Sequence, residues 1–167
     1  AGVPHLRVEN RCLGAGPTVA DMMANAAFYF GLVRHLAESE RPLWSQMSFS
    51  AAEENFHAAA ENGIDTQVYW PGVGQVRVTE LVLRKLLPLA HEGLDAWGVP
   101  AGDRDRLLAV IEQRCISGRN GASWQVDTVR RLEETTMVNR AQALREMTRR
   151  YAVHMHSNEP VHTWPAV

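Results

Sequence analysis

The stretch LRVENRCLGAGPTVADMMANAAFYFGLVRHL, residues 6–36, sets the fold of the first part of this chain. Charged and apolar residues alternate over Leu6–Cys12, which predicts a short strand. A run of small residues that ends at Pro17 follows. Thr18 and Asp21 then form a capping-box pattern, which predicts a long helix that begins at Thr18. The large apolar residues of this helix recur at helical spacing: Val19, Met22, Ala26, Phe30 and Val33.

The polar face of the predicted strand carries the candidate site. Leu6 and Val8 would lie on one face, and Glu9 would lie between Arg7 and Arg11 on the other. A carboxylate beside guanidinium groups suits a metal-bound phosphate, with Glu9 on the metal and Arg11 on the transferring phosphoryl group. Surface charge pairs are common and individually weak, so the pattern is more typical of a half-exposed strand whose charges pair in water. The spacing alone leaves both interpretations open.

The rest of the sequence predicts a mainly α protein, a bundle of five or six helices with one short N-terminal strand. Capping residues and terminal glycines bound further helices at about 50–62, 79–97, 103–115, 123–134 and 139–156. Pro88 should kink the helix that contains it, because proline lacks a backbone donor and clashes one turn back. Residues 66–76 contain glycine and proline between β-forming residues, which predicts a loop or a short hairpin.

Composition narrows the functional classes. The 167 residues are 46% hydrophobic, which suffices for the core of one domain. The net charge of −2 gives no electrostatic basis for binding nucleic acid or an acidic membrane. Cys12 and Cys115 are too few for a disulfide scaffold and match no zinc motif, which indicates a reduced cytoplasm. We find no signal peptide and no apolar run long enough to span a bilayer.

The C-terminal residues allow two interpretations. His154, His156, Glu159 and His162 lie close together in sequence, so a metal site is possible if the last helix ends between the first two histidines. Histidines that bind zinc from one helix are, however, four residues apart, whereas His154 and His156 are two residues apart. The alternative is a tail that packs back on the helices, with Trp164 as a plug.

Other arginines admit ordinary explanations. The loop at residues 118–121 precedes a helix whose N-terminus could bind an anion. The simpler interpretation is an ordinary turn between helices, with Arg119 solvated. The pairs Arg130–Arg131 and Arg149–Arg150 are most simply solvated helix faces.

Three stretches together resemble a known family. The run VENRCLGAGPTVADMMANAAFYFGLVRHL, residues 8–36, resembles a segment near the C-terminal end of the catalytic domain in the glutamate–cysteine ligase superfamily. The shared elements are a strand with Glu-x-Arg, a loop of small residues and a helix that ends in Gly-Leu. The stretches RPLWSQMSFSAAEENFHAAAENGIDTQVYWPG (41–72) and MHSNEPVHTWP (155–165) look like the version common in high-GC bacteria. The resemblance covers nearly the whole chain.

This resemblance implies an organisation for the chain. The chain would be a single helical C-terminal segment of a longer bacterial carboxylate–amine ligase. Strand and loop would occupy residues 1–17, helices 18–158 and a tail 159–167. The strand would belong to the catalytic sheet of the parent enzyme. Because the chain begins at Ala1, directly before that strand, we expect a fragment or an excised domain.

The resemblance also implies a reaction. In this family ATP phosphorylates the γ-carboxylate of glutamate, and the amine of cysteine displaces phosphate, in glutathione-type thiol biosynthesis. Glu9 would be one ligand of Mg²⁺, and Arg11 would be the catalytic and ATP-binding residue. The partners would be glutamate, cysteine or another small amine, and the N-terminal catalytic region of the same protein. We expect the isolated chain to be inactive. The alternative is a non-catalytic helical module for interaction or regulation.

Overall fold

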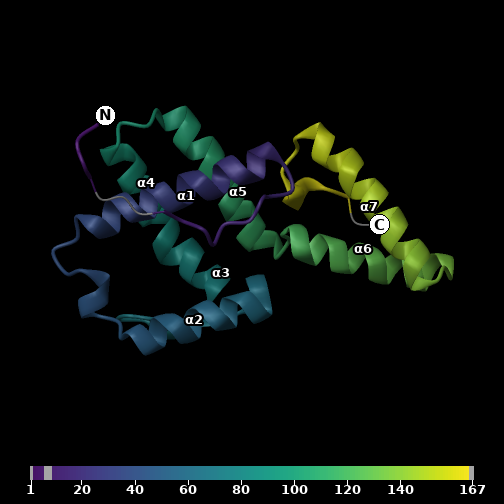
Figure 1. Cartoon of the computed structure of the whole chain (residues 1–167), viewed down its shortest axis with the longest axis horizontal. Helices are drawn as coiled ribbons and strands as arrows, with labels where there is room; N and C mark the ends of the chain where they lie inside the picture. The colour runs from purple at the N-terminus through teal and green to yellow at the C-terminus, as the bar shows by residue number, and fades with distance from the viewer. Residues whose placement is uncertain (1, 6–8, 166–167) are drawn as a thin grey trace.

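The computed structural model describes residues 2–5 and 9–165, and its architecture is mainly helical, as predicted (Figure 1). If the continuous segment Val78–Ala96 is counted as one helix, the described residues contain six helices and one two-stranded sheet. The long helices are α1 (Val19–Ala37), α2 (Phe49–Asn62), α4 (Leu87–Ala96), α5 (Ala101–Ser117), α6 (Gly121–Thr136) and α7 (Arg140–Ser157).

Capping residues bound these helices close to the predicted positions. The Thr18 hydroxyl accepts a hydrogen bond from the Asp21 amide at 3.1 Å and begins α1, as the sequence predicts. Ser48, two residues earlier than expected, caps α2. Gly118 adopts the left-handed conformation after α5, with φ of 64°. Asn139 and Gln142 form a capping box at the start of α7. Local chemistry therefore sets most helix ends.

The first strand of the prediction is not formed in the described part of its range. Glu9–Cys12 have no regular secondary structure, and Leu6–Val8 lie outside the described residues. A lone strand has no partner for its backbone groups, which explains why alternation alone does not produce a sheet here. The sheet instead forms at the second predicted position. β1 (Gln67–Trp70) pairs antiparallel with β2 (Gly74–Arg77), and the Asn55 side chain of α2 bonds to the Tyr69 backbone.

Pro88 is accommodated within a continuous helical segment. The short α3 (Val78–Leu81) leads through a π-helical turn at Val82–Leu86 into α4. The Leu87 amide donates to the Val82 carbonyl, five residues back. The wider turn relieves the contact that the proline ring would make with the preceding turn of an α-helix.

Small residues bring α1 against α4. A Cβ on Gly31 would overlap the Ala90 carbonyl, and a Cβ on Gly93 would overlap the Gly31 carbonyl, so the two backbones nearly touch. Ala24 and Gly31 are therefore on the buried face of α1. The large apolar residues that marked this helix in the sequence point mostly outward: Val19, Met22, Phe30 and Val33 are exposed.

The apolar core consists of two clusters. The first joins α1, the hairpin, α3, α4 and α5, and includes Leu81, Leu94 and Leu108. The second joins α6, α7 and the tail, and is centred on Trp124 and Trp164. In Figure 1, α6 and α7 form a helical hairpin at one end of the molecule. We call this hairpin with the tail the second helical unit, and the elements around the first cluster the first helical unit. The helices thus bury two separate apolar clusters, and the contacts that join these clusters are described below.

Candidate functional site

The structure places the two predicted site residues side by side. The Arg11 Nη2 atom lies 3.2 Å from Glu9 Oε1, and the side chains are 81% and 59% exposed. Their segment has no regular structure. An ion pair this exposed contributes about 0–1 kcal/mol, so a ligand could separate the two groups at little cost. Both side chains are therefore accessible to an incoming metal or phosphate.

The described residues do not supply a complete metal site. No group of three or more histidine, cysteine, aspartate or glutamate side chains among them is arranged to hold a metal ion. His154, His156, Glu159 and His162 therefore form no such group in the described structure. Glu9 is compatible with a role as a single protein ligand of Mg²⁺, because Mg²⁺ usually takes one or two carboxylates together with water and substrate phosphates.

The loop behind Glu9 and Arg11 leads into a buried polar cluster, which we call the Asp21 junction: Thr18, Asp21, Asn25, Arg114 and the Val161 amide. Asp21 is fully buried at the start of α1. It accepts hydrogen bonds from the Thr18 hydroxyl at 2.8 Å, from Arg114 Nη2 at 2.8 Å and from the Val161 amide at 3.1 Å. Arg114 Nη1 also donates to Asn25 at 2.7 Å. One carboxylate thus ties α1, α5 and the tail together.

The residues before this junction are held from two sides. A Cβ on Gly121, the first residue of α6, would lie 2.8 Å from the Pro17 ring, so Pro17 packs directly on the α6 backbone. The Asn158 side chain accepts a hydrogen bond from the Ala20 amide at the start of α1. The C-terminal end of the loop that follows Arg11 is therefore held at Pro17, on the backbone of α6, and the start of α1 is held by Asn158.

The tail packs back on the helices and Trp164 is its plug, as one of the two interpretations predicts. Trp164 is 1% exposed, and its ring stacks on His154 with centroids 5.1 Å apart. Its carbonyl accepts a hydrogen bond from Arg119 Nη1 at 2.8 Å. Arg119 is therefore not the solvated side chain of a turn, because it holds the tail. Trp124 Nε1 donates to the Pro165 carbonyl at 3.2 Å.

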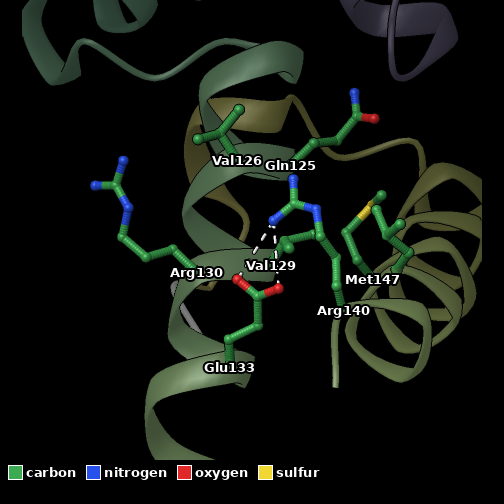
Figure 2. A pocket seen from close by; sticks show the side chains of 8 residues that line it. Gln125, Val126, Val129, Arg130, Glu133, Arg140 and Met147 are labelled. Carbon is green, nitrogen blue, oxygen red and sulfur yellow. Dashed lines mark hydrogen bonds and ion pairs between the residues drawn. The ribbon is translucent and has the colours of Figure 1, made fainter. Parts of the chain in front are cut away.

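A groove of about 380 Å³ lies between α6 and α7 (Figure 2). Arg140 Nη1 lies 3.3 Å and 3.4 Å from the two Glu133 carboxylate oxygens. Arg130 points away from this pair, and Val129 and Met147 line the groove. Sequence reasoning missed the ion pair because its members lie on two helices, on either side of the turn at Met137. The groove has a mixed lining and contains no nucleophile paired with a base.

Burial changes the ionisation of the groups around the Asp21 junction. Desolvation lowers the pKa of His162, while Asp21 opposes this shift and Arg114 adds to it. Within the described residues the buried His162 Nδ1 has no hydrogen-bond partner. Desolvation, and to a lesser extent Asp21, raises the pKa of Tyr151. Desolvation also raises the pKa of Cys115, which keeps its thiol protonated and poorly reactive.

The lowered pKa of His162 predicts acid sensitivity. Below about pH 6.5, the ordinary value, the unfolded chain binds a proton that the folded chain does not. This stabilising contribution is complete above pH 6.5 and is lost as pH falls through the lower folded-state pKa. Urea unfolding at pH 7.5 and 5.5 measures the loss. We expect His162→Gln to reduce it and His57→Gln, on the exposed surface of α2, to leave it unchanged. If the wild type and His162→Gln lose the same free energy of unfolding between pH 7.5 and 5.5, His162 is not the source of the acid sensitivity.

Two further findings concern the whole described chain. Its described helices include none that is both long and apolar enough to cross a membrane. Comparison with protein-family models, with curated proteins and with solved structures yields no match.

Proposed function

We propose that this chain is the C-terminal helical segment of a cytoplasmic, ATP-dependent carboxylate–amine ligase that joins glutamate to cysteine or another small amine. The residue pattern of the three stretches described above supports the ligase assignment. The observation that carries the site is the adjacency of Glu9 and Arg11, whose side chains are both accessible. The free thiols of Cys12 and Cys115 support a reducing compartment.

In this proposal the exposed pair exchanges partners when substrate binds. Glu9 would supply one hard oxygen ligand to Mg²⁺, and the planar guanidinium of Arg11 would bind phosphoryl oxygens. Mg²⁺ would neutralise charge on the transferring phosphoryl group. The resemblance implies that further carboxylates would come from the N-terminal catalytic region of the same protein. Because the ion pair is weak, its loss would oppose substrate binding little.

A second candidate is the non-catalytic helical module. The observation that favours it is the number of large apolar side chains exposed on α1 and α2, among them Phe30, Phe49 and Phe56. Exposed apolar surface of this extent is typical of proteins that associate with other chains. The two candidates differ in whether the protein encoded by the complete reading frame releases phosphate from ATP.

Kinetics of that protein test the ligase assignment. We expect Arg11→Lys to lower kcat about 10²–10³-fold with a smaller change in the KM for glutamate, because the planar fork matters most as charge develops on the phosphoryl oxygens. Glu9→Gln should raise the Mg²⁺ concentration required. The measurement is phosphate release with ATP, glutamate and cysteine or other small amines. The 167-residue chain alone should release none above background.

The matched control is the ion pair of Arg84 with Glu80, which are likewise solvent-accessible and lie 2.9 Å apart. Arg84→Lys and Glu80→Gln should leave the kinetics unchanged. If Arg84→Lys costs as much as Arg11→Lys, or if Glu9→Gln leaves the Mg²⁺ dependence unchanged, the roles are wrongly assigned. No phosphate release by the complete protein with any small amine would favour the interaction module.

A further inference from the structure

An apolar face formed by α1, the end of α4 and α5 is left uncovered in the described structure. Met23, Phe30 and Trp97 are large, exposed and apolar, and they surround one hollow of about 400 Å³. Ala26, Ala27, Leu94, Val99 and Leu107 complete its lining. Almost none of the exposed surface of this lining is polar. We call this surface the α1 face.

The close crossing of α1 and α4 explains why the α1 face exists. The crossing uses glycine and alanine, so the large residues of α1 cannot turn toward α4 without separating the two backbones. More than half of the Phe30 side chain and of the Trp97 side chain remains in water. Each such ring leaves roughly 100 Å² exposed. With Met23 and the exposed neighbours Val19 and Met22, the patch reaches roughly 500 Å², the upper range for a monomer.

We propose that the α1 face pairs two copies of this chain around a twofold axis, with Phe30 of each copy inserted into the hollow of the other. The geometry is self-complementary, because the exposed ring stands on the rim of a hollow on the same surface. An apolar cavity of about 150 Å³ already holds a benzene molecule, so a hollow of this size admits a phenyl ring. A twofold pair presents the same patch from both copies, as this arrangement requires.

The area and the charges fit a modest dimer. Two patches of roughly 500 Å² bury about 1,000 Å² in total, the lower limit for a specific interface. The Arg34 guanidinium lies 5.6 Å from the centre of the Trp97 ring and forms an ion pair with Glu38. Because this rim charge is already neutralised within the chain, the twofold pairing does not oppose two unpaired arginines. The pairing involves neither Glu9 nor Arg11, so it is independent of the ligase assignment.

Sedimentation equilibrium of the 167-residue chain at about 1–100 μM tests the proposal, since small interfaces dissociate in this range. We expect a monomer–dimer equilibrium for the wild type and at least about 30-fold weaker dimerisation for Phe30→Lys, as for an interface hot spot. Phe56→Lys is the matched control. Phe56 is 56% exposed, as is Phe30, but it lies on α2, outside the hollow. This variant should dimerise like the wild type.

Each outcome decides the proposal. Far-UV circular dichroism establishes that the variants fold, and Met23→Lys, a second rim substitution, replaces Phe30→Lys if that variant unfolds. A wild type that is monomeric throughout, or that forms only larger aggregates, overturns the pairing. So does dimerisation that persists in both rim variants, or that is weakened equally by Phe56→Lys.

Discussion

Asp21→Ala is expected to lower the free energy of unfolding by about 3–5 kcal/mol, the range found when one partner of a buried ion pair is removed. The substitution leaves the mostly buried Arg114 guanidinium without its carboxylate partner. It also removes the acceptor of the Val161 amide and of the Thr18 hydroxyl. A buried donor without a partner retains its full desolvation cost. Urea unfolding at a fixed protein concentration measures the change.

Asp95→Ala is the control for this prediction. Asp95 forms an ion pair with Arg104, but its side chain is 74% exposed, so its loss should cost at most about 1 kcal/mol. Asp21→Asn removes the charge but keeps the shape of the side chain, and its amide oxygen can still accept a hydrogen bond. This variant therefore measures the effect of the charge alone. Similar losses for Asp21→Ala and Asp95→Ala would show that the Asp21 junction does not hold the two helical units together.

Trp164→Ala is also expected to lower the free energy of unfolding by about 3–5 kcal/mol, the range for truncation of a buried aromatic residue. The Trp164 ring makes edge contacts with Trp124 and Tyr151, at centroid distances of 5.0 Å and 5.3 Å. Its removal opens a cavity at the centre of the second apolar cluster. Hydrogen exchange should therefore accelerate in α6 and α7 more than in α1 and α4, whose cluster does not include this ring.

Trp44→Ala serves as its control, since Trp44 is almost fully exposed and its loss should change stability by less than about 0.5 kcal/mol. The double variant Asp21→Ala/Trp164→Ala should lose less free energy of unfolding than the two single variants lose together, because both residues hold the same tail. Uniform acceleration of exchange across all helices, or strict additivity, would contradict a separate hairpin unit attached by the tail.

Local sequence patterns predicted the features that depend only on neighbouring residues, such as the ends of helices. The Thr18 hydroxyl caps α1 at the predicted position, because a hydroxyl that accepts an amide hydrogen bond needs only the next three residues. The Asp21 carboxylate, which was predicted to complete a capping box, instead accepts from the Thr18 hydroxyl, Arg114 and the Val161 amide. Gly118 ends α5 because glycine adopts the left-handed conformation without a steric penalty. The tail also follows from the sequence in outline, since Trp164 was expected to pack back as a plug.

Long-range pairing could not be predicted in this way. Alternation over Leu6–Cys12 suggested a strand, but Glu9–Cys12 have no partner strand and form none. The spacing of Val19, Met22, Phe30 and Val33 was compatible with a core-facing stripe, yet these residues are exposed. Asp21 was expected as a capping residue, whereas its contacts with Arg114 and Val161 link positions 93 and 140 residues away.

The sequence by itself determined that this protein is mainly α and where most of its helices begin and end. These conclusions depend on backbone hydrogen bonds and side-chain types within a few residues. The assignment of Glu9 and Arg11 to phosphoryl transfer stays a prediction. The tertiary structure decided which face of α1 is buried, because the approach of Gly31 to Ala90 and Gly93 permits only small residues at the crossing. It also decided that one buried carboxylate joins two apolar clusters, since residues distant in the chain become neighbours only when their helices pack.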